Sequence, residues 1–96
     1  MNTTYFKPGT ELTFNSVVAI RNKLFKLLKT DSNEIFCLDL TEVIHCDSAG
    51  LALLIEAKKL CKQHNKNFKV VGISTKTQSL AAFCGVNDIL EPSQAV

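Results

Sequence analysis

Several features of common protein classes are missing from this 96-residue sequence. It has no Trp, and its one Tyr, Tyr5, is not interleaved with basic residues as a base-stacking platform for nucleic acids requires. It has no run of about 18 apolar residues, so a membrane-spanning helix is not expected. The first residues, Met1 to Tyr5, lack the basic and apolar stretches of a signal peptide, and we therefore expect a cytoplasmic protein.

The sequence also lacks a strong charge of either sign. Its formal net charge is +2, and most basic residues fall in two separate segments, 21–29 and 58–69. Each segment has the pattern of the solvated side of a helix or of its flanking turn. This distribution gives little support to nucleic-acid binding.

The four cysteines lack the close spacing of a disulfide framework and fall inside apolar segments, which indicates reduced, buried thiols. They are Cys37, Cys46, Cys61 and Cys84. Cys46 stands between two other metal-ligating residue types, His45 and Asp47, but adjacent positions do not converge on one ion without more distant partners. We therefore predict no metal and no other cofactor.

Catalysis has weak support in the sequence. His45 lies close to Ser48, and Asp47 has the right chemistry to orient the imidazole. A serine and a histidine without a defined third group or an oxyanion site do not make a triad. We predict a protein that is not an enzyme.

The apolar pattern predicts one α/β domain over residues 1–96, in which about three to four helices flank a small mixed sheet. Residues 5–14 predict one strand or a short hairpin around Pro8-Gly9, and 35–40 a central strand covered on both faces. Residues 68–73 predict another strand, and Ile89-Leu90 a last, short one. Helices are expected from Asn15 or Ser16 to about Thr30, from Asp47 or Ser48 to about His64, and from Thr75 to Gly85, the last with a capping box from Thr75 to Gln78 and an apolar stripe of Leu80, Phe83 and Cys84.

The long helix that opens at Asp47 or Ser48 directs free backbone amides out of the carboxyl end of the sheet. Ala49 and Gly50 are small, so another protein's backbone, or a phosphate on Ser48, has room to approach this turn. The simpler interpretation is that Asp47 or Ser48 only caps the helix.

The long helix also places apolar residues outside its expected buried stripe. Leu51, Ala52 and Ile55 project toward the charged side, in the same sector as Ser48. They form a predicted docking surface, unless other parts of the chain cover them. Val18 and Phe25 leave the stripe of the first helix in the same way and form a secondary contact hypothesis.

The stretch from Cys37 to Leu54 resembles the core signature of STAS domains, in which a strand ending in Asp-Leu precedes Asp-Ser/Thr-x-Gly-Leu at the start of a helix. Residues 9–12, 70–72 and 80–83 extend the similarity over nearly the whole chain. Residues 50–54, 65–72 and 86–90 are most similar to the small cytoplasmic subunit of Mla-type phospholipid ABC transporters.

The resemblance implies a non-catalytic accessory subunit that binds and supports the ATPase subunit of the transporter. The transporter as a whole maintains the lipid asymmetry of the outer membrane. Such a subunit is peripheral to the inner membrane and meets the membrane only through the transporter complex. The alternative implied by the same family is an anti-sigma-factor antagonist, whose motif serine, here Ser48, binds an anti-sigma factor kinase and is switched by phosphorylation. In both cases we predict a partner-binding site that comprises Asp47, Ser48, Ala49, Gly50, Leu51, Ala52 and Ile55.

One departure from the family concerns the N-terminus. STAS domains usually have an additional strand ahead of the first helix hairpin, and only a handful of residues precede Phe6 here. With that N-terminal strand missing, the sheet is expected to be shorter or to carry an unpaired edge, with which a second copy could pair.

Overall fold

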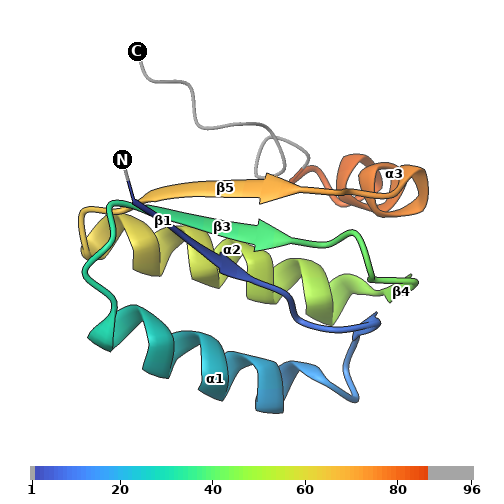
Figure 1. Cartoon of the computed structure of the whole chain (residues 1–96). Coiled ribbons are helices and arrows are strands. Elements are labelled where there is room, and N and C mark those ends of the chain that lie inside the picture. Colours follow the sequence, from blue (N-terminus) through green and yellow to red (C-terminus); the bar gives the residue numbers. More distant parts are fainter. Residues whose placement is uncertain (1, 87–96) are drawn as a thin grey trace.

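The computed structural model describes residues 2–86, which fold into three helices and five strands (Figure 1). The strands are β1 (Thr3–Phe6), β2 (Glu11–Leu12), β3 (Ile35–Asp39), β4 (His45–Cys46) and β5 (Asn67–Val71). The helices are α1 (Val17–Thr30), α2 (Ser48–Gln63) and α3 (Thr75–Phe83). The predicted strand at Ile89-Leu90 lies outside the described residues.

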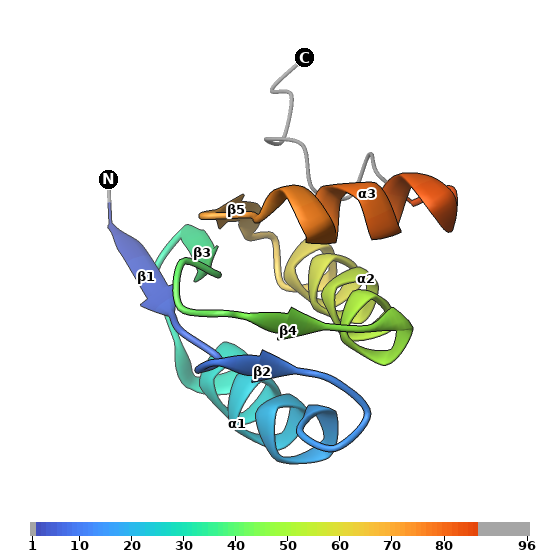
Figure 2. The same cartoon turned by 90° about the vertical axis from the view of Figure 1, so that its right-hand side faces the viewer.

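The main sheet has the strand order β1-β3-β5, and a second pair joins β2 to β4 beyond its carboxyl end (Figure 2). Every pairing within residues 2–86 is parallel, where the sequence had predicted a mixed sheet. The predicted α/β class and the central position of β3 are confirmed. β3 has a parallel strand on each side, and four of its five residues are apolar and buried, which suits a central strand.

Helices α1 and α2 pack side by side against one face of the main sheet (Figure 1). β5 alternates buried and exposed residues, and its buried Phe68 and Val70 face these helices within the hydrophobic core. Phe36 and Leu38 of β3 belong to the same core. Within residues 2–86 no helix covers the opposite face of the sheet, where Tyr5, Cys37 and Lys69 lie in one row across the three strands.

The N-terminal segment differs from the predicted strand or hairpin. β1 and β2 do not pair with each other, because the chain leaves the main sheet between them at Gly9, whose φ of 103° suits a residue without a side chain. β1 pairs with β3, and β2 pairs with β4. The N-terminal strand that was expected to be missing is present as β1, and in the described part of the chain its outer edge has no partner strand.

The capping and the buried face of α3 also differ from the prediction. Its N-cap is Ser74, not Thr75: the Ser74 hydroxyl accepts a hydrogen bond from the backbone N–H of Thr77 at 3.1 Å. The Ser74 hydroxyl also donates to the Thr77 hydroxyl, so the buried Thr77 side chain has a hydrogen-bond partner. Thr77 and Ala81 therefore face inward, whereas Phe83 and Cys84 are exposed. Gly85, at φ 74°, follows the end of the helix as predicted.

Lys66 holds together the amino ends of the three main strands. Its ammonium donates to the Asp31 carboxylate at 3.2 Å and to the backbone carbonyls of Asp31 and Asn33. The other carboxylate oxygen of Asp31 accepts a hydrogen bond from the Thr4 hydroxyl at 2.8 Å. The Lys66 side chain is only 5% exposed, so its charge depends on these partners.

Replacing Lys66 with alanine leaves the Asp31 carboxylate without its cation. We expect Lys66→Ala to lower the free energy of unfolding by about 3 kcal/mol, because breaking one half of a buried ion pair removes compensation for a desolvated charge. The matched control is Lys69→Ala, on the exposed face of β5, which should change stability by less than about 0.5 kcal/mol. Equal urea midpoints for the two variants would contradict a structural role for Lys66.

Candidate functional site: the first turn of helix α2

The carboxyl end of the sheet brings together the starts of the helices. The segment before α1, the β2-β4 pair and the first turn of α2 all lie at this end (Figures 1 and 2). α2 follows β4 after a single residue, Asp47. The prediction that a helix opens here at the rim of the sheet is confirmed.

Asp47 caps α2 and binds the segment before α1 with the same carboxylate. Its Oδ1 accepts from the backbone N–H of Gly50 at 3.1 Å, and its Oδ2 accepts from the backbone N–H of Phe14 at 3.0 Å. The bond from Phe14, and less strongly that from Gly50, hold the pKa of Asp47 below its ordinary value of 3.8, against the opposing effect of burial. Asp47 is therefore a structural residue that fixes the shape of the site.

Ser48 has no comparable structural task. It is the first residue of α2 and is exposed, and its hydroxyl forms no hydrogen bond with residues 2–86. Of the two capping residues that the sequence allowed, Asp47 does the capping. The Ser48 hydroxyl is left facing solvent beside the positive end of the α2 dipole.

Gly50 does not leave an opening for a partner, contrary to the prediction. A Cβ at this position would lie 2.0 Å from the backbone carbonyl oxygen of Leu12, so β2 already fills the space that the missing side chain provides. Gly50 is buried, and its small size serves contact within the chain.

Of the other predicted partner-binding residues, Ala52 is exposed, Ala49 and Ile55 are half-buried, and Leu51 is buried at 2% exposure. The placement of Leu51 on an accessible surface is therefore wrong. α2 contacts β2 and β4 as well as β5, so its buried arc is wider than a helix facing a single sheet would show. Ser48 and Ala52 remain as the exposed members of the predicted set.

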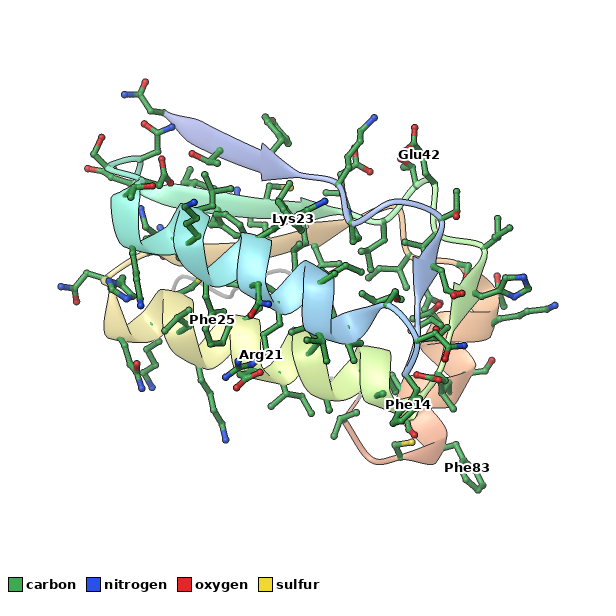
Figure 3. The ribbon with its side chains drawn as sticks, turned by 90° about the horizontal axis from the view of Figure 1, so that it is seen from below. Phe14, Arg21, Lys23, Phe25, Glu42 and Phe83 are labelled. Carbon is green, nitrogen blue, oxygen red and sulfur yellow. The ribbon has the colours of Figure 1, made fainter. Side chains whose placement is uncertain are left out.

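The structure adds exposed apolar side chains that the sequence analysis missed. Phe14 is 77% exposed and lies directly before α1, and Phe83 is 90% exposed at the end of α3 (Figure 3). Ile44, before β4, is 70% exposed. Their signal in the sequence is weak, because an aromatic or aliphatic residue near a helix end is usually taken for a core residue.

Val18 belongs to the same end of the molecule as Ser48. The backbone N–H of Phe14, before α1, donates a hydrogen bond to Asp47, before α2. One helical turn beyond Val18 and Ala52, the guanidinium of Arg21 donates two hydrogen bonds to the Glu56 carboxylate, at 2.9 and 3.1 Å. These two links place Val18 of α1 and Ala52 of α2 between them. We call Phe14, Val18, Ser48 and Ala52 the Ser48 surface.

Phe25, the other residue of the secondary contact hypothesis, is less available. It is half-buried, and the Arg21 guanidinium lies over its ring at 4.3 Å from the centroid. Its apolar face is thus covered from within the chain.

The chemistry of the cysteines and of His45 gives no second site. All four thiols are free; Cys37 and Cys61 are buried, and burial raises the pKa of Cys61 to about 11. Cys84 is exposed, so the prediction of a buried thiol is wrong there. Among residues 2–86 no three His, Cys, Asp or Glu side chains are grouped to hold a metal ion.

Comparison with known proteins shows the family of this chain. A family model described as "Mlab, STAS domain" matches residues 9–91. The chain belongs to the STAS domain family. The anti-sigma-B factor antagonist of Staphylococcus epidermidis is 25% identical over 88 residues, which is 92% of this chain and 81% of that protein.

Solved STAS-like structures share the fold of this STAS domain. The anti-sigma factor antagonist SpoIIAA in its unphosphorylated form has a TM-score of 0.76 at 15% identity, covering 98% of this chain and 82% of SpoIIAA. SpoIIAA, described as a Bacillus cell fate determinant, in its phosphorylated form gives 0.69 at 15% identity, covering 97% and 84%. A sulfate transporter family protein from Wolinella succinogenes gives 0.74 at 16%, covering 93% and 71%.

The role of Asp47 predicts a pH-dependent contribution to stability. Because its pKa is lowered in the folded protein, the ionised carboxylate stabilises the fold above the ordinary value of 3.8, and this contribution is lost as pH falls through the folded pKa. We expect Asp47→Ala to lower the free energy of unfolding at pH 7 by about 1–2 kcal/mol. The gap between variant and wild type should narrow below pH 3.8 in urea titrations. A gap that stays constant with pH would refute this role of the charge.

The contact at Gly50 predicts a steric effect on stability. We expect Gly50→Ala to cost about 1–3 kcal/mol, because the new methyl group must displace the backbone of β2. Ala52→Ser, on the exposed side of the same helix, is the control and should melt within a few degrees of wild type. A Gly50→Ala protein as stable as wild type would show that this turn has free space.

Proposed function

We propose that this STAS domain is a regulatory protein of the anti-sigma-factor-antagonist type, which binds a partner through the Ser48 surface and releases it when Ser48 is phosphorylated. The observation that carries the proposal is the division of tasks between Asp47 and Ser48. Because Asp47 makes the capping bonds, the exposed Ser48 hydroxyl can be modified without removing a bond that the fold needs.

The surroundings of Ser48 suit a switch of this kind. A phosphate there adds a charge of about −1.5 to −2 next to the Asp47 carboxylate and among exposed apolar side chains. The free N–H groups of the first turn of α2 favour the phosphate within the isolated domain. An apolar partner surface covering Phe14, Val18 and Ala52 would have to desolvate that charge, which opposes binding.

The similar proteins support this role above the transporter role that the sequence analysis placed first. The curated relative is named an anti-sigma-B factor antagonist, and SpoIIAA is described in unphosphorylated and phosphorylated forms. In this proposal the partner is an anti-sigma factor kinase.

A second candidate is the accessory subunit of an Mla-type ABC transporter, bound to the ATPase subunit at the cytoplasmic side of the inner membrane. The specific observation in its favour is the description of the matching family model, which names Mlab. Both candidates use the Ser48 surface. They differ in the partner and in whether Ser48 carries a phosphate.

The proposal predicts which protein is captured and how a negative charge changes capture. Tagged wild-type protein, expressed in its native cell, should recover a kinase-like anti-sigma factor, and intact mass should show a fraction phosphorylated at Ser48. Ser48→Glu should reduce recovery at least about tenfold, since the added charge must be desolvated in the interface.

Ser79→Glu is the matched control, because Ser79 is exposed on α3 and should leave capture unchanged. Recovery of an ABC ATPase without phosphate on Ser48 would replace the antagonist role with the transporter role. Equal recovery by wild type and Ser48→Glu would overturn the assignment of the interface.

A further inference from the structure

The structure brings together two basic segments that are far apart in the sequence. α1 and α2 carry seven of the chain's 11 Lys and Arg residues but one of its nine Asp and Glu residues, Glu56. The two helices together therefore have a net charge of +6, and the rest of the chain has a net charge of −4, which gives the total of +2. Since α1 and α2 pack side by side against one face of the sheet, these positive charges are carried by one layer of helices (Figure 1).

We infer that this helix layer is an electrostatic docking surface for an anionic lipid bilayer. The layer consists of the exposed cations Lys23, Lys26, Lys29, Lys59 and Lys62, with Lys58 half-buried at its margin. Arg21 is tied to Glu56 and contributes no free charge. Six lysines in one layer fall within the range of cationic clusters that bind acidic lipids, each adding to the attraction.

The chemistry of the layer favours lipid over a protein partner. All its free cations are lysines, which are hydrated point charges on flexible stems, whereas recognition of fixed carboxylates in a protein commonly uses the rigid fork of arginine. The one arginine of the chain is already used in this way within the molecule, for Glu56. Hydrated lysine cations on flexible stems match the diffuse negative potential of a membrane surface.

Stabilisation of the helices does not account for the layer. Lys29 and Lys62 lie in the last turns of α1 and α2, where a cation interacts favourably with the helix dipole. Lys23, Lys26, Lys58 and Lys59 lie outside these turns, and the single acidic residue on the two helices is bound to Arg21. The molecule measures 32 × 31 × 20 Å, so a broad face is available to lie flat on a bilayer.

The proposed contact lies on the surface and needs no insertion. No helix within residues 2–86 has the length and apolar character that crossing a bilayer demands. Most apolar residues of α1 and α2 belong to the core or pack against it, whereas Val18 and Ala52 are exposed on the Ser48 surface. This inference is independent of the proposed function, although it departs from the expectation that the chain meets the membrane only through a partner complex.

Vesicle co-sedimentation of the purified full chain tests the inference. The probes are vesicles of phosphatidylcholine alone and vesicles in which about a third of the lipid is phosphatidylglycerol, at low salt and at about 0.5 M NaCl. We expect partitioning to the anionic vesicles to exceed that to the neutral ones at least about tenfold at low salt, and to be lost at high salt.

Two charge-reversed variants of equal net charge separate the helix layer from overall charge. In one, Lys26, Lys29 and Lys59 become Glu; in the other, Lys7, Lys69 and Lys76, which lie outside the helix layer, become Glu. The first should lose at least about tenfold in partitioning and the second should lose clearly less, since attraction falls off over a Debye length. Circular dichroism confirms that both are folded.

Three results would overturn the inference. These are equal binding to neutral and anionic vesicles, equal losses in the two folded variants, and tighter low-salt binding to polyglutamate or a short DNA duplex than to the anionic vesicles. The last result would reassign the layer to an acidic protein or to nucleic acid. None of these outcomes bears on capture through Ser48, so failure here is distinguishable from failure of the proposed function.

Discussion

The Asp47 carboxylate joins two parts of the chain that are 33 residues apart, and the shape of the candidate site depends on this one group. One oxygen sets the start of α2, and the other fixes the segment that leads into α1. Both bonds come from backbone N–H groups, so the geometry does not depend on which side chains surround it. Because Asp47 makes the capping bonds, the exposed hydroxyl of the next residue, Ser48, has no structural task in the fold.

Two polar links lie at opposite ends of the sheet, one at the amino ends of the strands and one at the proposed binding site. At the amino ends of the strands, Lys66 forms a buried ion pair with Asp31. The Lys66 ammonium also donates to two backbone carbonyls, and these three bonds hold the turns there together. At the carboxyl ends, Asp47 uses a partly exposed carboxylate, and the apolar side chains around it face solvent. The burial of the first link holds a small sheet that, in the described part of the chain, has helices on one face only. The opposite end exposes Phe14 and Phe83.

The sequence predicted those features that follow from local periodicity. The strand at 35–39, the helix from Ser48 and the stop at Gly85 were found because their signals lie within a few residues of one another. The errors arose where distant contacts decide. A helical wheel cannot show that α2 contacts β2 and β4 as well as β5, or that β2 fills the space beside Gly50. Lys66 lies in a polar turn that gave no sign of a buried cation, and Ser74 and Thr75 are equally good caps by residue type.

The helix layer and the Ser48 surface share the same two helices but occupy different parts of them. Val18 and Ala52 lie near the helix starts, whereas Lys26, Lys29, Lys59 and Lys62 lie in the later turns. A partner at the Ser48 surface would therefore leave most of the lysines free to meet anionic lipid. A phosphate on Ser48 would lower the net positive charge of these two helices by up to about two. Because Ser48 lies more than a Debye length from the last turns of the helices, salt would screen the effect of the phosphate on the lysines there. In these two proposals the contacts are thus coupled weakly, so a change of partner at the Ser48 surface leaves the charge of the helix layer nearly unchanged.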